Sequence, residues 1–397
     1  MSDMNFLERL LDGVAVEWKP LGELAENLDF MRKPVASGSR DSGEIPYYGA
    51  SGIVDYVKDY IFDGDFLLVS EDGANLVARN TPIAFSISGK SWVNNHAHIL
   101  KFDTYAERRY IEYYLNSIDL TPYISGAAQP KLNQKNLNSI KIPNPSLAIQ
   151  AEIVRILDTF TALTAELTAE LSAELSDRQK QYNYYRDRLL TFEEGEVEWK
   201  TLGDVSLKSY SGSTPTAGKS EYYDGGTIPW LRTQEVRFSD IEETEIKITP
   251  SALKNSSVKW IPRNCVIIAI SGATAGRSAI NKIPLTTNQH CCCLEIDPEK
   301  ALYRYVFHWV SLNHENLKGL GQGARGDINS GIIKSFKIPV PQLKEQARIV
   351  TILDKFDTLT HSISEGLPRE IALRQQQYEY YRDLLLSFPK VEEGANN

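Results

Sequence analysis

Residues 141–164 read KIPNPSLAIQAEIVRILDTFTALT and residues 337–360 read KIPVPQLKEQARIVTILDKFDTLT, so one phrase occurs twice in the chain. A second phrase repeats at the same distance. RQKQYNYYRDRLLTF (178–192) returns as RQQQYEYYRDLLLSF (374–388), with 11 of 15 residues identical. A repeat at a fixed spacing indicates that one structural unit is used twice.

Two long blocks lie between these repeated phrases. Each block opens with a short repeat, VEWKPLG (16–22) for the first and VEWKTLG (197–203) for the second. Beyond these openings the two blocks do not resemble each other in sequence, so we expect two unlike globular domains, each followed by one copy of the connector. The start of the chain, LERLLDG, echoes the exit of the first connector, RDRLLTF. The end of the second connector is therefore expected near the start of the chain, in a closed arrangement with pseudo-twofold symmetry.

The repeated connectors are predicted to be long helices. Their apolar residues, from Ile149 in the first copy and Ile349 in the second, recur at steps of four and three, which is the rhythm of a coiled coil. Each copy predicts a helix of about 40 residues, or about 60 Å. Because the first connector leads from one block to the other and the second leads back, we expect them to pair antiparallel. Gly366 and Pro368 interrupt the second copy and predict a kink or short break there, since proline has no amide to donate.

The first connector contains TAELTAELSAEL (164–175), in which a four-residue unit occurs three times. Alanine, glutamate and leucine favour helix, so the units extend it. Each unit adds about 6 Å and about 40° of net rotation, which is close to the ~34–36° turn of one B-DNA base pair. One interpretation is an accidental tandem duplication in a plain amphipathic helix. Because the helix joins two blocks in a duplicated frame, we favour a ruler that sets the angle between two recognition blocks.

The bulk composition is that of a globular protein of two or three domains, with 397 residues and a formal net charge of −9. The first block, residues 25–139, carries 11 Lys/Arg and 14 Asp/Glu, and the second, residues 206–335, carries 15 and 12. The acidity therefore belongs mostly to the connecting segments and the ends, so DNA binding is not excluded. We identify no signal peptide, apolar run of membrane-spanning length or cysteine framework, and expect a cytoplasmic protein that does not enter the membrane.

The two unlike blocks, the duplicated KIP-x-P connector, the QY-x-YYRD phrase and the tandem TAEL unit make the whole chain resemble the specificity subunits of type I restriction–modification enzymes. The tandem unit is similar to the spacer of the IC subfamily. The resemblance implies that each block is a target recognition domain binding half of a split site in double-stranded DNA. It implies that the helices dock two methylation subunits, and that the number of TAEL units sets the gap in the site. The methylation subunits would hold S-adenosylmethionine, and two restriction subunits using ATP and Mg would complete the assembly.

The predicted fold class is α+β, with two α/β target recognition domains joined by two long helices in an antiparallel, pseudo-twofold coiled coil. Each recognition domain ends just before a connector begins. The predicted limits are 1–145 for the first recognition domain, 146–192 for the spacer helix with the TAEL units, 193–341 for the second recognition domain, 342–388 for the second spacer helix and 389–397 for a tail.

Loops rich in glycine and small polar residues occur in both blocks and are candidate DNA contacts. Glycine turns with serine and threonine expose amides and hydroxyls that suit phosphates, whereas arginine, lysine, glutamine and asparagine can read base edges. Such loops are also common as plain turns with solvated side chains, so the hypothesis applies to the clusters more than to any single residue. The candidates are Ser51, Gly52, Asn75, Asn94, Asn95, Gln129 and Lys131 in the first block, and Gly212, Ser213, Thr214, Arg232, Thr233, Gln234, Ser271, Thr274, Arg277, Asn288, Gln322 and Arg325 in the second.

Motifs of catalysis are absent from the sequence. It has no GxxxxGK(S/T) phosphate-binding loop and no Asn/Asp-Pro-Pro-aromatic motif of adenine methyltransferases. Cys291, Cys292 and Cys293 are predicted on one strand, where neighbours point to opposite faces, which favours core packing over a metal centre. His96 and His98 could share a strand face, but no third ligand is evident. We therefore predict no catalytic residue, metal or cofactor in this chain; the alternatives are a coiled-coil adaptor that binds proteins rather than DNA, and an enzyme with a divergent active site.

Overall fold

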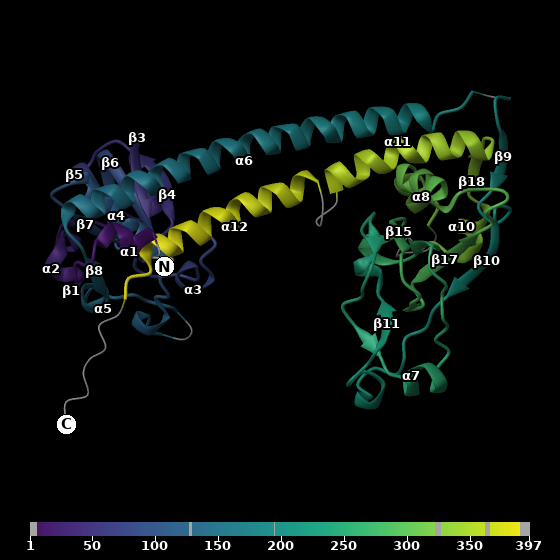
Figure 1. Cartoon of the computed structure of the whole chain (residues 1–397), viewed down its shortest axis with the longest axis horizontal. Helices are drawn as coiled ribbons and strands as arrows, with labels where there is room; N and C mark the ends of the chain where they lie inside the picture. Colours follow the sequence, from purple (N-terminus) through teal and green to yellow (C-terminus); the bar gives the residue numbers. More distant parts are fainter. Residues whose placement is uncertain (1–5, 127–128, 194, 322–326, 362–365, 390–397) are drawn as a thin grey trace. The chain divides into compact units, whose positions relative to one another are not determined.

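The computed structural model describes residues 6–126, 129–193, 195–321, 327–361 and 366–389. The chain divides into two compact units: unit 1 contains Met1–Thr168 with Leu373–Asn397, and unit 2 contains Ala169–Ala372. Each unit therefore holds one block and parts of both connectors (Figure 1). Within the described ranges, no helix is both long and apolar enough to cross a membrane.

Unit 1 is built on a six-stranded sheet in the order β2-β7-β5-β6-β3-β4. Neighbouring strands are antiparallel except β3 and β6, which are parallel. Along the central strand β5, Leu67 and Val69 enter one hydrophobic core while Phe66 and Leu68 enter another, because successive side chains of a strand point to opposite faces. The strands are β2 (Glu26–Asn27), β3 (Ser42–Gly49), β4 (Gly52–Val57), β5 (Phe62–Ser70), β6 (Ala84–Val93) and β7 (Ala97–Lys101).

Helix α4 (Tyr105–Ser117) packs on β5 and β6. It begins at a capping box, in which Thr104 and Glu107 accept each other's otherwise free amides. Its residue Tyr110 is fully buried in the same core as Leu67. The other elements of unit 1 are the strand pair β1 (Glu17–Pro20) and β8 (Lys141–Asn144), and the helices α1 (Phe6–Leu11), α2 (Leu21–Leu24), α3 (Asn75–Ala78) and α5 (Gln134–Ser139).

Unit 2 contains a five-stranded sheet in the order β10-β17-β14-β15-β12, a three-stranded sheet β13-β11-β16 and the pair β18-β9. The predicted cysteine strand is confirmed. Cys291 and Cys293 of β17 enter one core and Cys292 enters another, as the alternating faces of a strand require. The strands are β9 (Glu198–Thr201), β10 (Ser206–Ser211), β11 (Ile228–Leu231), β12 (Asp240–Ile241), β13 (Lys247–Ile248), β14 (Val266–Ala269), β15 (Ser278–Asn281), β16 (Thr286–Thr287), β17 (Cys291–Ile296) and β18 (Lys337–Val340), and the helices are α7 (Pro250–Asn255), α8 (Tyr303–Leu312), α9 (His314–Gly319) and α10 (Ser330–Ser335).

The first connector is one helix, α6 (Leu147–Leu189), of 43 residues, whereas the second consists of α11 (Leu343–His361) and α12 (Leu367–Leu386). Gly366 precedes α12 with a φ of +80°, where a Cβ atom would come within 2.5 Å of the carbonyl oxygen of Thr358. This left-handed conformation favours glycine and cannot continue a helix. The break predicted at Gly366 and Pro368 is therefore confirmed.

In unit 1 the start of α6 packs against the end of α12. Ile153 shares a core with Leu385. Further along α6, Phe160 stacks on Tyr381, with ring centroids 5.4 Å apart. Later residues of α6 meet earlier residues of α12, so the two helices run antiparallel in this unit (Figure 1).

In unit 2 the second half of α6 packs against α11. Tyr185 stacks on Phe356, with ring centroids 5.6 Å apart, and the later residue Leu190 shares a core with Ile349. The helices therefore run antiparallel in this unit as well. The predicted pairing of the two repeated connectors is present within each unit.

Each block contains an equivalent helix that packs on a connector helix, α4 in the first block and α8 in the second. Arg109 begins the phrase RYIEYY in α4, and Arg304 begins the phrase RYVFHW in α8. Through Nε and Nη2, Arg109 donates to Asp158 of α6 at 3.2 and 2.9 Å, and Arg304 donates to Asp354 of α11 at 2.9 and 2.7 Å. The two blocks, although unlike in sequence, therefore contain an equivalent helix that contacts the connector through an arginine and an aspartate.

Candidate nucleic-acid interface

In unit 1, loops from three parts of the first block meet where strand β5 ends. Each is held by a hydrogen bond from the residues that follow this strand, so candidate contacts that are far apart in the sequence become neighbours. The Ser70 hydroxyl donates to the carbonyl of Ala50, the amide of Glu71 donates to the carbonyl of His96 at 2.9 Å, and the amide of Gly73 donates to the carbonyl of Pro130 at 3.2 Å.

Five candidates of unit 1 lie on these loops. Ser51, Asn95, Gln129 and Lys131 are exposed, and Gly52, the first residue of β4, is half-buried with a φ of +123°, a conformation that favours glycine. Amide, hydroxyl and ammonium groups therefore gather at one end of the sheet. This is a surface that can contact both phosphates and base edges.

Two other candidates of unit 1 have structural partners. Asn94 is buried, and its Oδ1 accepts the amide of His96 at 2.8 Å. The side chain of Asn75 accepts the amide of Thr81 and donates to its carbonyl, each at 3.0 Å. Both asparagines thus shape loops, and their DNA contact stays a prediction.

In unit 2 the corresponding place is the end of strand β14. Here too, backbone hydrogen bonds collect loops that carry candidate contacts. Ile270, which follows this strand, donates to the carbonyl of His290 at 3.0 Å and accepts from the amide of Ile328 at 2.8 Å, while the amide of Asn288 donates to Leu231 at 3.1 Å and the amide of Ser213 donates to Thr287 at 2.9 Å.

The Arg232 segment holds three candidates of unit 2. The Arg232 guanidinium lies 2.5 Å from a carboxylate oxygen of Glu245 and 3.6 Å from one of Glu235. Thr233 is half-buried and Gln234 is exposed. The side-chain oxygen of Gln234 accepts from the same guanidinium at 2.9 Å. Arg232 would therefore have to exchange two carboxylates for a base or phosphate, and Gln234 would have to leave Arg232 to contact DNA.

The glycine turn at the start of the second block is held on strand β16. A Cβ atom on Gly212 would overlap the carbonyl oxygen of Thr287, so this glycine is required for close packing. Thr214 is exposed, and its hydroxyl donates to the Gln289 side chain at 2.6 Å. The candidate turn 212–214 is thereby fastened to the loop that contains Asn288.

The turn after β14 contains the candidates Ser271, Thr274 and Arg277. Ser271 Oγ lies 2.8 Å from Nδ1 of His290. The carbonyl of Thr274 accepts the amide of Arg277 at 3.0 Å, and both side chains are half-buried. Gln322 and Arg325 lie outside the described residues, and their contact with DNA stays a prediction.

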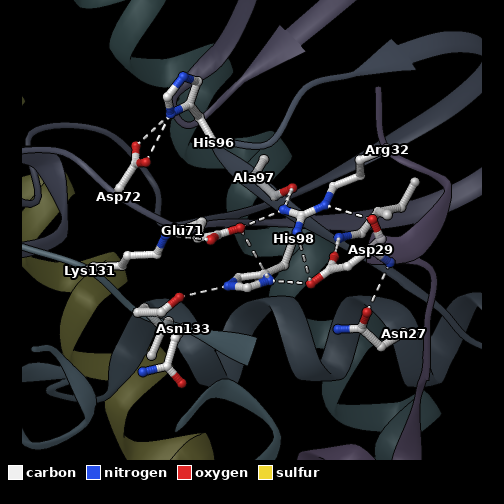
Figure 2. Close-up of polar contacts among 12 residues, drawn as sticks. Asn27, Asp29, Arg32, Glu71, Asp72, His96, Ala97, His98, Lys131 and Asn133 are labelled. Atoms are coloured by element: carbon white, nitrogen blue, oxygen red, sulfur yellow. Dashed lines mark hydrogen bonds and ion pairs between the residues drawn. The ribbon is translucent and has the colours of Figure 1, made fainter. Parts of the chain in front are cut away.

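A buried cluster of charged side chains lies behind the loops of unit 1, and sequence reasoning missed it. His98 has Nδ1 2.6 Å from Asp29, and the Arg32 guanidinium lies 2.5 Å from Glu71 and 3.4 Å from Asp29. The Lys131 ammonium completes the cluster, 3.1 Å from Glu71 (Figure 2). The cluster therefore connects the exposed loop of Lys131 to the sheet.

Asp29, Glu71 and His98 form a group whose ligand atoms lie within 4.8 Å of one another, which is the spacing of a metal site. The surroundings favour ion pairs instead. Nε2 of His98 lies 2.7 Å from the carbonyl of Leu132 while Nδ1 faces Asp29, so each ring nitrogen already has a protein partner and neither is open to a metal ion. A metal ligand needs a nitrogen with a free lone pair, and the Arg32 and Lys131 cations already pair with the two carboxylates.

The cluster also changes the acidity of its carboxylates. Burial raises the pKa of Asp29, but the hydrogen bond and charge of His98, together with Arg32, outweigh it, so this pKa lies below its ordinary value of 3.8. Burial likewise raises the pKa of Glu71, yet Arg32, His98 and Lys131 bring it below its ordinary value of 4.5. Both groups are therefore charged in the folded protein at neutral pH.

These directions predict acid sensitivity of unit 1. A carboxylate whose pKa is lower in the folded state stabilises the fold above its ordinary pKa, and this contribution is lost as the pH falls through the folded value. Asp29→Asn is expected to cost about 1–3 kcal/mol at pH 7. The cost should shrink as the pH falls below 3.8, the ordinary value. Thermal unfolding of both proteins between pH 7 and pH 3 measures the difference.

Asp63→Asn is the matched control, because Asp63 is an exposed carboxylate on β5 of the same unit. It should change stability by less than about 0.5 kcal/mol at every pH. A difference between the Asp29 variant and the unaltered chain that stays constant down to pH 3 would contradict the lowered pKa.

Comparison with known proteins gives consistent matches. The family described as type I restriction modification DNA specificity domain matches residues 14–177 and 194–373. A type I restriction enzyme specificity subunit of Escherichia coli is 41% identical over the whole of both chains. A putative type I restriction enzyme specificity subunit of Haemophilus influenzae is 38% identical over 98% of this chain and 99% of its own.

Solved structures show the same fold. A crystal structure of the specificity subunit from Mycoplasma genitalium matches 96% of this chain and 98% of its own, with a TM-score of 0.54 at 12% identity. A chain from a study of complex assembly in a type I restriction–modification system matches 94% of this chain and 98% of its own, with a TM-score of 0.63 at 15% identity. At these identities the likeness concerns the arrangement of elements.

Proposed function

This chain belongs to the type I restriction–modification DNA specificity family, and on that premise we propose that it is the DNA-reading subunit of such a complex. Each block reads one half of a bipartite site in double-stranded DNA, and α6 sets the gap between the halves. The chain is a recognition subunit and not the catalytic one. Its place of action is the cytoplasm, where the host DNA lies.

The observation that carries this proposal is the convergence of polar loops at one end of the sheet in each unit. In unit 1 exposed candidates gather around the end of β5, and in unit 2 the loops that carry the candidates, most of them half-buried, meet around the end of β14. Side chains of this kind, mounted on a rigid sheet, suit phosphate and base-edge contacts. The reading surface of each block consists of the candidate residues of its loops. The two recognition domains span residues 1–145 and 193–341.

The repeated helices are the docking elements for partner subunits. Tyr184 of α6 is 57% exposed, and Tyr380 of α12, which occupies the same position in the repeated phrase, is 64% exposed. Aromatic side chains exposed at equivalent positions are typical of interface anchors. We assign these surfaces to two methylation subunits, which hold S-adenosylmethionine and bring two restriction subunits that use ATP and Mg.

The test is DNA binding by the chain assembled with its methylation subunits. Sequencing methylated adenines in a host that expresses the complete system identifies the site, and gel shifts with that duplex and with scrambled duplexes measure selectivity. A specific complex should bind its site about 10³-fold or more tightly than scrambled DNA. An adaptor that binds only proteins would leave every duplex unshifted, and methyl transfer by the purified chain alone would point to an active site in the chain itself.

A further inference from the structure

A turn of the form Asn-x-His occurs in both blocks. It reads Asn94-Asn95-His96 in the first block and Asn288-Gln289-His290 in the second. In each turn the Oδ1 atom of the asparagine accepts the amide of the histidine two residues later, at 2.8 and 3.1 Å. Both asparagines are buried, so they hold the turn from within.

The two turns occupy the same position in their sheets. The carbonyl of His96 accepts the amide of the residue after β5, and the carbonyl of His290 accepts the amide of the residue after β14, at 2.9 and 3.0 Å. The strands that leave the turns pair back in the same register. Ser70 pairs with Ala97 and Ala269 pairs with Cys291, the last residue of one strand with the first of the next.

Each histidine ring is fixed through one nitrogen. Nδ1 of His96 lies 3.0 and 2.9 Å from the two carboxylate oxygens of Asp72, in a pair that is separate from the buried His98 cluster (Figure 2). Nδ1 of His290 lies 2.8 Å from Oγ of Ser271. Asp72 and Ser271 are both the second residue after their strand, so the fastening is equivalent.

Each ring presents its other nitrogen to solvent. The His96 side chain is 52% exposed, and His290 is also exposed. Across the described ranges, neither Nε2 atom has a hydrogen-bond partner. In each block the asparagine side chain holds the turn, and the histidine belongs to none of the hydrophobic cores. The fold therefore does not require an exposed imidazole at this position in both blocks.

The partners of the two rings give them different hydrogen-bonding characters. A carboxylate only accepts, so Asp72 keeps a proton on Nδ1 of His96, and in the neutral ring Nε2 is then an acceptor. A serine hydroxyl can donate to Nδ1 of His290, which leaves the proton on Nε2 as a donor. Two rings at one structural position can therefore match different base edges, as two different half-sites require.

We propose that His96 and His290 are the corresponding specificity-determining residues of the two blocks, each placing Nε2 on a base edge in the half-site that its own block reads. Asp72 and Ser271 are positioning residues that set the ring. This inference rests on the proposed function, because it names the DNA contact of the same surface. The neighbouring exposed candidates, among them Asn95 and Lys131 in unit 1, lie on the loops that meet at this turn.

The test uses the complex with methylation subunits and the site found by sequencing methylated adenines. Binding of His96→Ala and His290→Ala is measured on that site and on duplexes with single base-pair changes in each half. Loss of a base-edge contact is expected to weaken binding to the site by roughly 5- to 100-fold. His96→Ala should also lose discrimination at one position of the half-site that block one reads, and His290→Ala at one position of the other half-site.

His314→Ala on α9 is the matched control, because Nδ1 of His314 faces the carbonyl of Ser311 and not the turn. It should leave affinity and discrimination unchanged. Asp72→Ala should relax the same base-pair position as His96→Ala, whereas Asp72→Asn, which keeps an acceptor for Nδ1, should restore discrimination. His96→Gln and His290→Gln serve where an alanine variant alters the melting temperature, and they too should lose discrimination in one half-site only.

The outcomes separate this inference from the function beneath it. If the unaltered complex selects its site and the histidine variants do so with the same affinity and discrimination, the assignment of His96 and His290 is wrong while the proposed function stands. If the unaltered complex selects no DNA sequence, both fall together.

Discussion

Removal of Thr164–Leu167, one four-residue unit of α6, is expected to shorten the gap between the two half-sites and to leave both half-sites unchanged. Helix α6 is continuous through all three four-residue repeats. The boundary between the compact units 1 and 2 falls within these repeats, after Thr168. The leucines of the three repeats, Leu167, Leu171 and Leu175, are all half-buried, so the apolar face of α6 continues through the repeats. A deletion here therefore shortens helix α6 and leaves the loops of candidate DNA contacts untouched.

The size of the effect follows from helix geometry. One unit accounts for about 6 Å and a net rotation of about 40°, and one base pair of B-DNA turns ~34–36°. Binding to the parent site should fall to the level of scrambled DNA, which lies about 10³-fold or more below specific binding. A duplex with a shorter gap should regain tight binding.

Methylated-adenine sequencing in a host that expresses the variant reports the new site directly. Deletion of Ser172–Leu175 is the matched control and should give the same new gap, because only the number of units matters. Changed half-sites at an unchanged gap would refute the ruler.

Leu353→Ala is expected to destabilise unit 2 by about 2–5 kcal/mol, because the side chain is fully buried and its loss leaves a cavity. Leu353 lies in α11 and shares a core with strand β14 and helix α8. The melting temperature of this unit should fall by about 5–15 °C. Hydrogen exchange of the β14 amides, compared with those of β5 in unit 1, measures where stability is lost.

Leu157→Ala provides the reciprocal comparison. Leu157 occupies the same position in the repeated phrase, and it is fully buried in the core of unit 1. Its loss should expose the β5 amides and leave those of β14 protected. Equal loss of protection in both units from either variant would show that the chain unfolds as one body, contrary to the division into two cores.

Elements with a local signal could be predicted from the sequence. The heptad rhythm and the positions of Gly366 and Pro368 were enough to predict the helices and the break, because helix formation depends on residues within a few turns. The run Cys291–Cys293 was predicted as core packing from the alternation of a strand, which is also a local property. The candidate loops were chosen by composition, and the structure shows which of them meet.

Elements made by distant residues could not be predicted in this way. Asp29, Glu71 and His98 come together only because three separate segments meet in one sheet, and no spacing in the sequence marks them as partners. Arg109 and Arg304 are recognised as equivalent because they donate to Asp158 and Asp354, which occupy the same position in the repeated phrase; the sequences around the two arginines alone do not show it. A search of the two blocks for a shared Asn-x-His would have found His96 and His290, but only their backbone contacts show that the two turns correspond.

The duplicated frame can be recognised in the amino-acid sequence because the same phrases occur twice, and the course of the helices can be recognised because apolar residues recur with the period of a helix. Which loops of each block form one surface, and which histidine nitrogen faces solvent, depend instead on the folded arrangement of the chain. Those features arise from hydrogen bonds between segments that lie far apart in the chain, and such bonds form only once the sheets have brought their strand ends together.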